Sequence, residues 1–190
     1  MYLLCLLVML MRVITGICKG KRLFTPDGMD VRPTSDKVKE GLFSALQFDI
    51  EGRRVLDLFA GSGQLSIEAL SRGAKSAVLV DNSASSIKVI KKNIELCSLG
   101  DRAKVYQSDY AAFCAMSRDV FDIAFLDPPY DEGILESALK AVLPLMSDYG
   151  LIVCEHPPKV ELPELIGGFY VLKTYSYGKI NLTVYRKGQS

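Results

Sequence analysis

The sequence predicts an α/β protein with a doubly wound, mostly parallel sheet of seven strands, an antiparallel pair at its carboxyl-terminal edge, and a small β-hairpin before it. Three observations support this prediction. From residue 53 onward, apolar runs of strand length alternate with amphipathic stretches of helical period. Glycines at 61 and 63 join the first such strand to its helix. The last two apolar runs are joined by a short turn around Ser176-Tyr177-Gly178.

The elements follow one another along the whole chain. The predicted strands are 55–60, 77–81, 103–107, 120–126, 150–154, 169–175 and 180–185. The predicted helices are 34–46, 65–71, 83–97, 110–116 and 135–146, with a possible short helix at 160–166. Pro144 should kink or end the helix in which it lies. Lys37 and Lys39 lie off the apolar stripe of the first helix, so we expect them to face solvent.

The chain divides into three predicted parts. Residues 1–10 are apolar, but they are fewer than the ~20 residues that span a bilayer, and they lack the features of a secretory signal. We interpret them as a start assigned too early, with Met11 as the natural first residue, or as a short apolar extension. Residues 11–31 form the hairpin, and residues 32–190 form the main domain.

Composition narrows the class of protein. The chain has 190 residues, of which 49% are hydrophobic and 24% charged, as expected for one globular domain. Its five cysteines show no C-x-x-C spacing, which favours a reducing cytoplasm over a disulfide framework or a zinc site. The single histidine, His156, makes a histidine-based metal site or nucleophile triad improbable. We expect His156 to be structural.

Charge is unevenly distributed although the net charge is only +1. The segment 12–22 holds four basic residues and no acid, and no acid follows Glu164. Such clusters permit a local surface for phosphates, but ordinary solvated charge is equally consistent with them. The basic residues toward the amino terminus are Arg12, Lys19, Lys21, Arg22 and Arg32.

Acidic residues end three successive predicted strands. Asp57 begins the turn Asp57-Leu-Phe-Ala-Gly61-Ser62-Gly63, Asp81 ends the second strand, and Asp109 ends the third, followed by Tyr110. Glycines in such a turn let the backbone approach a ligand closely, and an acid at the second strand suits ribose hydroxyls. Each aspartate alone could equally cap the helix that follows it.

The glycine turn does not match a dinucleotide fingerprint. It reads D-x-x-x-G-S-G rather than G-x-G-x-x-G, and the Asp57 carboxylate would repel a pyrophosphate. A carboxylate there suits a cofactor with a cationic amino-acid end, which points to S-adenosylmethionine.

The fourth strand ends in Asp127-Pro128-Pro129-Tyr130. Two prolines fix two φ angles, so this corner holds a carboxylate, backbone carbonyls and an aromatic ring in a rigid arrangement. Oxygens can accept hydrogens from the amino group of a flat ring while Tyr130 stacks on its plane. A simple proline-rich turn would explain the four residues alone about as well.

The sequence resembles the bacterial 16S rRNA (guanine-N2)-methyltransferases, which are class I S-adenosylmethionine-dependent enzymes. The resemblance covers nearly the whole chain from Met11 to about Lys187 and departs at Ser66, where the family usually has glycine, and at Asn82. The motifs that carry it are Met11-Arg-Val-Ile-Thr-Gly16, Arg32-Pro-Thr34 with Glu40-Gly-Leu-Phe43, Asp57 to Gly63, Glu68-Ala-Leu-Ser-Arg-Gly-Ala74 and Asp127 to Tyr130.

The resemblance implies a Rossmann-like methyltransferase fold and methyl transfer to N2 of one guanine in 16S rRNA, within a small-subunit particle in the cytoplasm, with no metal or membrane. It implies that Asp127, Pro128, Pro129 and Tyr130 receive the guanine. The expected cofactor residues are Asp57, Phe59, Gly61, Ser62, Gly63, Asp81, Asn82, Asp109 and Tyr110. Charge clustering, rather than the resemblance, suggests five basic residues for contact with rRNA phosphates: Arg12, Lys19, Lys21, Arg22 and Arg32.

Other activities remain open from the sequence. The same corner serves methylases of adenine N6 or glutamine N5, and a non-catalytic RNA-assembly factor could use the same fold. A compact amino-terminal hairpin weighs against a sequence-specific DNA enzyme, and the presence of Asp127 and Tyr130 weighs against a pure binding protein.

Overall fold

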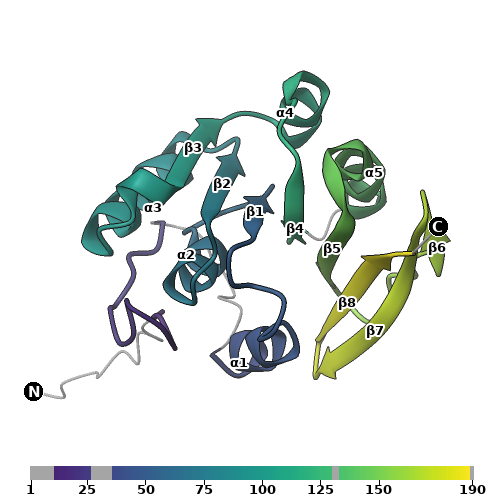
Figure 1. Ribbon diagram of the computed structural model, residues 1–190, viewed down its shortest axis with the longest axis horizontal. Coiled ribbons are helices and arrows are strands. Elements are labelled where there is room, and N and C mark those ends of the chain that lie inside the picture. Colours follow the sequence, from purple (N-terminus) through teal and green to yellow (C-terminus); the bar gives the residue numbers. More distant parts are fainter. Residues whose placement is uncertain (1–10, 27–35, 130–132, 189–190) are drawn as a thin grey trace, which may run out of the picture.

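A computed structural model describes residues 11–26, 36–129 and 133–188. Its strands form one eight-stranded sheet in the order β3-β2-β1-β4-β5-β8-β7-β6 (Figure 1). β1 to β5 are parallel neighbours, whereas β8, β7 and β6 continue the sheet in antiparallel pairs. The strands are β1 Arg54–Asp57, β2 Ser76–Asp81, β3 Ala103–Gln107, β4 Phe121–Leu126, β5 Met146–His156, β6 Leu165–Ile166, β7 Phe169–Tyr177 and β8 Ile180–Lys187.

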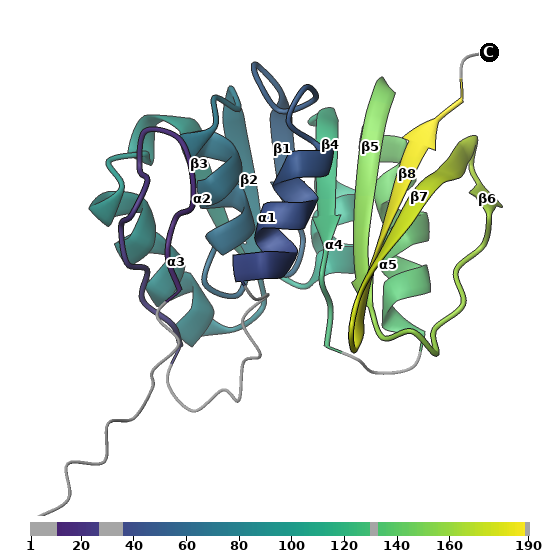
Figure 2. The ribbon, with the colours of Figure 1, turned by 90° about the horizontal axis from the view of Figure 1, so that it is seen from below.

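Helices cover both faces of the sheet, as a doubly wound fold requires (Figure 2). The α-helices are α1 Asp36–Ala45, α2 Gln64–Ser71, α3 Ala84–Leu96, α4 Tyr110–Met116 and α5 Ile134–Val142. One buried cluster joins α1, α2 and α3 to one face of the sheet, and a second joins α4 and α5 to the other. The predicted fold class is therefore confirmed.

Proline and serine act at the helix ends as the sequence predicts. Ser83 caps α3 by accepting a hydrogen bond from the backbone N–H of Ser86. Pro144 lies in a single 3₁₀ turn, Leu143–Leu145, that follows α5 directly. The helix ends at Val142 because proline lacks the N–H that a continuing helix needs.

The predicted short helix at 160–166 is wrong, and this region supplies the eighth strand. Leu165–Ile166 pairs antiparallel with the start of β7. Gly167 and Gly168 between them have φ angles of 55° and 82°. Two adjacent residues with positive φ form the tight turn that matches the twist of a hairpin, so the Gly-Gly pair specifies a hairpin here.

The predicted amino-terminal hairpin is present as two arms that meet at one antiparallel bridge, between Arg12 and Arg22. The backbone N–H of Val13 donates to the carbonyl of Lys21 at 3.0 Å, and that of Leu23 donates to the carbonyl of Met11 at 2.8 Å. We call residues 11–26 the amino-terminal segment. Four of its side chains, those of Met11, Val13, Cys18 and Leu23, are buried in the cluster that holds α1, α2 and α3.

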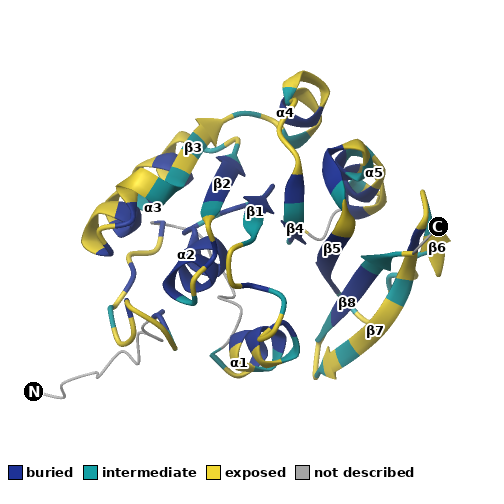
Figure 3. Cartoon of the chain, in the orientation of Figure 1, coloured by how far each residue is buried: buried dark blue, intermediate teal, exposed yellow. Residues whose placement is uncertain are grey.

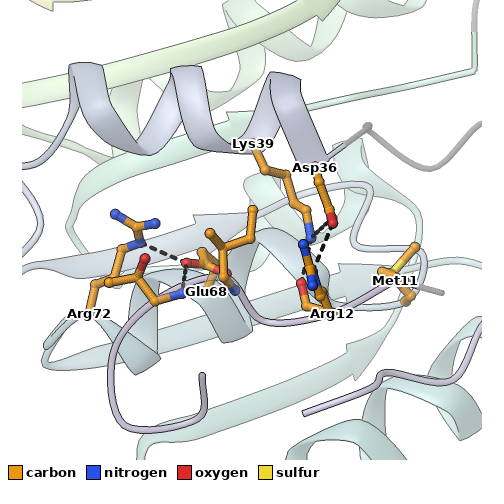
Figure 4. A network of polar contacts seen from close by, with 9 residues as sticks. Met11, Arg12, Asp36, Lys39, Glu68 and Arg72 are labelled. Atoms are coloured by element: carbon orange, nitrogen blue, oxygen red, sulfur yellow. Dashed lines mark hydrogen bonds and ion pairs between the residues drawn. The ribbon is translucent and has the colours of Figure 1, made fainter. Parts of the chain in front are cut away.

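The prediction that Lys39 faces solvent is wrong. Its side chain is only 1% exposed, because the amino-terminal segment covers that side of α1. Lys39 Nζ donates to the carbonyl of Arg12 at 2.8 Å and lies 3.5 Å from Asp36 Oδ1 (Figure 4). Burial lowers the pKa of Lys39 although Asp36 opposes this effect. The periodicity of one helix does not reveal what a distant segment covers.

Candidate active site

The strand order reverses between β1 and β4, which are neighbours, while β2 and β3 lie on one side and β5 on the other. At such a switch point the loops after the two strands turn to opposite faces and leave a crevice at the carboxyl edge. The glycine turn follows β1, and Asp127 follows β4. The two motifs singled out in the sequence therefore lie at adjacent strand ends.

The glycine turn is anchored to the end of β2. The backbone N–H of Gly61 donates to Asp81 Oδ2 at 2.8 Å, and Asp81 Oδ1 accepts from the backbone N–H of Ser83 at 2.9 Å. Gly61 has a φ of 55°, and a side chain placed there would project into open space. The turn thus leaves an uncovered stretch of backbone beside the Asp81 carboxylate, which still has lone pairs for further donors.

Gly63 is required for a different reason. Its φ is 77°, and a Cβ there would lie 3.0 Å from Leu79 Cδ2 in the core. Ser62 between the glycines is buried, and its Oγ donates to Met11 Sδ at 3.0 Å. The turn is therefore held from below by β2 and from the side by the amino-terminal segment.

Asp57 lies beneath this turn and is only 2% exposed. Its Oδ2 accepts a hydrogen bond of 3.0 Å from Ser66 Oγ. Burial raises the pKa of Asp57 to about 7, and the nearby Asp81 contributes to the rise. The serine that departs from the family pattern at residue 66 thus supports this carboxyl directly.

Asp127 carries the second perturbed carboxyl. Burial raises its pKa well above the ordinary value, and the charges of Glu155 and Asp57 raise it further. Pro128 beside it is buried, and Pro129 is exposed. Tyr130 lies outside the described residues. Carboxyl groups from β1, β4 and β5 thus meet in one partly dry region that favours a cation.

An aromatic pair borders the same edge. The rings of Phe59 and Tyr110 have centroids 5.3 Å apart and are tilted by 42°. Phe59 belongs to the glycine turn, and Tyr110 begins α4 after β3.

Asp109 caps α4, with its Oδ1 accepting from the backbone N–H groups of Ala111 and Ala112. Its capping role and a ligand role remain compatible, because these bonds use only one oxygen. Asn82 is exposed and offers its carbonyl to Gln107 at 3.5 Å.

Sequence reasoning missed two residues here. Glu155 directly follows the predicted fifth strand, as Asp127 follows the fourth, and it is buried. Asn93 is fully buried in α3. Its Nδ2 donates to the carbonyls of Ser62 and Phe24 at 2.8 and 3.0 Å, and its Oδ1 accepts from the Phe24 N–H at 2.8 Å. A polar residue on the apolar stripe of a helix was the available signal for Asn93.

Four of the five predicted basic residues lie on the amino-terminal segment. Arg12, Lys19 and Arg22 are exposed, and Arg12 Nε pairs with Asp36 Oδ2 at 3.0 Å. Lys21 Nζ donates to the carbonyl of Leu96 at 2.6 Å, at the end of α3. Arg32 lies outside the described residues. Their role in RNA binding remains a prediction.

A buried carboxylate fixes the segment to α2 (Figure 4). Glu68 accepts from the backbone N–H groups of Ile14 and Thr15 at 2.7 and 3.0 Å and from Arg72 Nε at 2.7 Å. At the far end of α2 from the glycine turn, Gly16 packs so closely that a Cβ would lie 1.9 Å from the carbonyl oxygen of Ser71. A hollow of about 450 Å³ borders this contact, and it lies at the wrong end of α2 to belong to the site.

His156 has the structural surroundings expected of it. It is buried at the end of β5, with Nε2 2.9 Å from Thr183 Oγ1 and Nδ1 3.0 Å from the carbonyl of Pro157. No group of three or more His, Cys, Asp or Glu within the described ranges could hold a metal ion. In the same part of the chain, no helix has the length and apolar character needed to cross a membrane.

Comparison with known proteins gives the family. A model of the family described as "Conserved hypothetical protein 95" matches residues 11–186. The chain belongs to this family. Members of similar sequence include the "Putative rRNA methyltransferase YlbH" of Bacillus subtilis, which is 42% identical over 186 residues, covering 93% of this chain and 99% of the relative. The "Ribosomal RNA small subunit methyltransferase D" of Escherichia coli is 32% identical over 178 residues, covering 93% and 89%.

Comparison with solved structures also finds proteins described as methyltransferases or methylases. The solved structure described as "Putative methyltransferase yhhF from Escherichia coli" superposes with a TM-score of 0.85 at 32% identity, over 94% of this chain and 98% of that one. A putative methylase of Haemophilus influenzae, HI0767, superposes with a TM-score of 0.79 at 28% identity, over 95% and 99%. The resemblance noted in the sequence, to bacterial methyltransferases of small-subunit rRNA, is thus confirmed at the level of family and fold.

Proposed function

We propose that this protein is an S-adenosylmethionine-dependent methyltransferase of 16S rRNA and that it methylates the exocyclic N2 of a guanine. The observation that carries the proposal is the pairing of the glycine turn after β1 with the Asp127 corner after β4, at the switch point of the sheet. The names of the relatives support rRNA of the small subunit as the substrate. An rRNA substrate also agrees with the cytoplasmic location expected from the cysteines.

The residues at the strand ends fit the cofactor by their chemistry. When bound, S-adenosylmethionine supplies an electrophilic methyl group on a positively charged sulfur. The bare backbone at Gly61 admits a ligand close to the turn, and the Asp81 carboxylate has lone pairs left for ribose hydroxyls. The rings of Phe59 and Tyr110 would border a flat adenine, and Asp109 would accept from its amino group.

The carboxyl groups fit the charge of the cofactor. In the free protein, Asp57 and Asp127 hold protons more tightly than ordinary carboxyls. A cation placed beside them stabilises their ionised forms and lowers both pKa values. Asp57 and Asp127, whose ionisation is costly in the free protein, would therefore favour a cationic ligand over a neutral or anionic one.

Asp127 and Pro128 would position the base. The lone pair of a guanine N2 is delocalised into its ring, so this nitrogen is a poor nucleophile. Hydrogen bonds from the amino group to the Asp127 side chain and to the Pro128 carbonyl would stabilise the positive charge that develops as nitrogen attacks. By fixing the amino group, Asp127 and Pro128 would hold its nitrogen at near-attack distance, about 3–3.5 Å, from the methyl group that the bound cofactor would supply. The methylated amino group would then lose one proton to solvent. Tyr130 would stack on the base, which must be unpaired or flipped.

The test is transfer of tritium from labelled cofactor into 30S particles from cells that lack the protein. We expect the label in 16S rRNA, and nuclease digestion should release it as N2-methylguanosine. Label released as N6-methyladenosine would show that adenine, not guanine, is the methylated base. Label in protein would favour glutamine methylation, and cofactor binding without transfer would favour the assembly factor.

A further inference from the structure

The outer face of α3 carries lysines with no acidic partner. Lys88, Lys91 and Lys92 are exposed, and Lys91 and Lys92 follow Lys88 by three and four residues, so the three share one side of the helix. Figure 3 shows α3 with a mixture of exposed and buried residues along its length. Ile87, Ile90 and Ile94 occupy the opposite, buried side. Within the described part of the chain, no ion pair involves these three lysines. Neighbouring like charges destabilise a helix slightly, and an anionic partner would relieve that repulsion.

The amino-terminal segment extends this basic face. Lys21 Nζ reaches the carbonyl of Leu96 at 2.6 Å, and the backbone of Phe24 is held at both N–H and C=O by Asn93. Residues 21–24 therefore run along α3 toward its amino-terminal end. Six basic residues, Lys19, Lys21, Arg22, Lys88, Lys91 and Lys92, gather on these two elements, and Glu95 is the only acid within α3 itself.

An aromatic ring lies among these charges. Phe24 is 46% exposed, and Lys92 Nζ lies 4.4 Å from the centre of its ring. An exposed ring interleaved with basic side chains is the arrangement that binds single-stranded nucleic acid, because bases stack on the ring while phosphates pair with the cations. A peptide of acidic residues would satisfy the lysines but would give the ring nothing flat to stack on.

The position of α3 connects this face to the candidate active site. Ser83 caps α3, and its backbone N–H donates to Asp81 Oδ1, so the helix begins beside the glycine turn that Asp81 anchors. From there the 13 residues of α3 extend about 20 Å. That length matches roughly six stacked nucleotides at about 3.4 Å each.

From these observations we infer that α3 and residues 21–24 form a docking surface for an unpaired segment of the substrate RNA, in which Lys88, Lys91 and Lys92 contact phosphates and Phe24 stacks on a base. The inference rests on the proposed function and extends it to residues beyond the basic cluster of the amino-terminal segment. It assigns no chemical step to them. They contribute affinity for RNA, and the strand ends carry out the transfer.

The experiment measures direct binding of protein to 16S rRNA by filter retention over a range of salt concentrations. We expect Lys88→Ala/Lys91→Ala to weaken binding about 10-fold or more and to lower the slope of log affinity against log salt by about 1.4–1.8, since each lost phosphate contact removes ~0.7–0.9. Phe24→Leu should weaken binding about 5-fold or more with an unchanged salt slope.

The matched control is Lys75→Ala/Lys140→Ala, which removes the same charge from the start of β2 and from α5. It should bind like the wild type. All variants should keep the melting temperature, the cofactor affinity and, at saturating RNA, the rate of transfer. Equal binding by the α3 variant and the control would overturn the docking surface, whether or not the wild type methylates RNA. Tight RNA binding without transfer would instead refute the proposed function alone.

Discussion

At the scale of single residues, the carboxyl groups of Asp57, Asp127 and Glu155 lie together at the carboxyl edge of the sheet. Beyond the effect of burial, the charges of Glu155 and Asp57 raise the cost of ionising Asp127, and the charge of Asp81 raises that of Asp57. Ser66 offsets part of that cost for Asp57 by a hydrogen bond. A site built in this way is less stable when empty than when it holds a cation.

The first prediction concerns Asp127→Asn. Because the amide cannot stabilise positive charge on the attacking nitrogen as a carboxylate does, we expect methyl transfer to fall about 10²- to 10³-fold. Cofactor affinity should also fall, because Asp127 is one of the two carboxyls that favour a cationic ligand, but by a smaller factor than the rate of transfer. The free variant should melt at a higher temperature than the wild type, because an amide avoids the cost of ionising a buried carboxyl beside Glu155 and Asp57, with a gain on the order of 1 kcal/mol.

Single-turnover assays and calorimetry measure these two effects. Asp119→Asn, at an exposed position in the loop before β4, removes the same formal charge and should change neither. An Asp127→Asn enzyme with wild-type rates would show that the corner does not act on the substrate.

The second prediction concerns pH. The Asp57 carboxyl, with a pKa of about 7, binds a proton in the folded free protein at pH values where the unfolded chain, with a pKa near 3.8, has lost it. Its contribution to the free energy of unfolding therefore falls as pH rises from about 4 to about 7. Cofactor binding that favours the ionised form must release a proton, so affinity should rise up to about tenfold per pH unit below pH 7.

Isothermal titration of the cofactor between pH 5.5 and 8.5 measures this dependence. Asp57→Asn should bind weakly and with a shallower pH profile, because only Asp127 then couples cofactor binding to pH. Ser66→Ala removes the hydrogen bond that lowers the pKa of Asp57, so its profile should move to higher pH. A wild-type affinity that does not change with pH would contradict the prediction.

At the scale of elements, α2 is the helix that holds the site and the amino-terminal segment together. Its first turn follows Gly63, its middle carries Ser66 and Glu68, and its end contacts Gly16. Every residue of α2 is buried, although Glu68 and Gln64 are polar. The helix is covered by the sheet on one side and by the segment on the other (Figure 2).

The third prediction tests this connection through Glu68→Gln. The amide offers one acceptor oxygen where the carboxylate offers two, so one of the backbone donors at Ile14 and Thr15 loses its partner. We expect the free energy of unfolding to fall by about 2 kcal/mol or more. Urea titration measures it, and amide exchange should quicken at residues 14 and 15.

Glu136→Gln is the control, because its pair with Lys140 is exposed on α5 and should contribute about 0.5 kcal/mol at most. Equal losses in the two variants would mean that the contact of Glu68 with the backbone contributes no stability of its own.

How far the sequence predicts these elements depends on whether their signals are local. Ser83, Pro144 and the aspartates that follow strands act on their own neighbours, so the sequence indicates them. Lys39 and Asn93 are different, because each is buried by a segment far away in the chain, and neither helix reveals that contact. Gly167-Gly168 was a local signal for a hairpin that the sequence interpretation passed over.

At the scale of the whole molecule, a layer of helices covers each face of one sheet (Figure 1). The strand order places the candidate site between β1 and β4, where the order reverses. The candidate site lies at the carboxyl edge of the parallel strands. The antiparallel strands β8, β7 and β6 lie beyond β5 and extend the sheet away from that crevice.

The fourth prediction concerns truncation from the amino terminus. A chain that begins at Met11 keeps every contact described above and should unfold at the same temperature as the full chain. A chain that begins at residue 27 loses four buried apolar side chains and the donors to Glu68. At roughly 1.5–3 kcal/mol for each buried aliphatic side chain, we expect it not to fold stably.

Thermal denaturation followed by circular dichroism compares the three chains. Cooperative melting of the chain that begins at residue 27, near the temperature of the full chain, would show that the segment only rests on the domain.

The single bridge of the amino-terminal segment has a practical consequence for engineering. Since its arms share so few bonds with each other, the segment takes its shape from Glu68, Ser71 and Asn93, which belong to α2 and α3. If residues 11–26 were transplanted onto another methylase, we therefore expect them to keep this conformation only when these three hydrogen-bonding residues are grafted with them. A chimaera that carries all three would be the smallest portable unit.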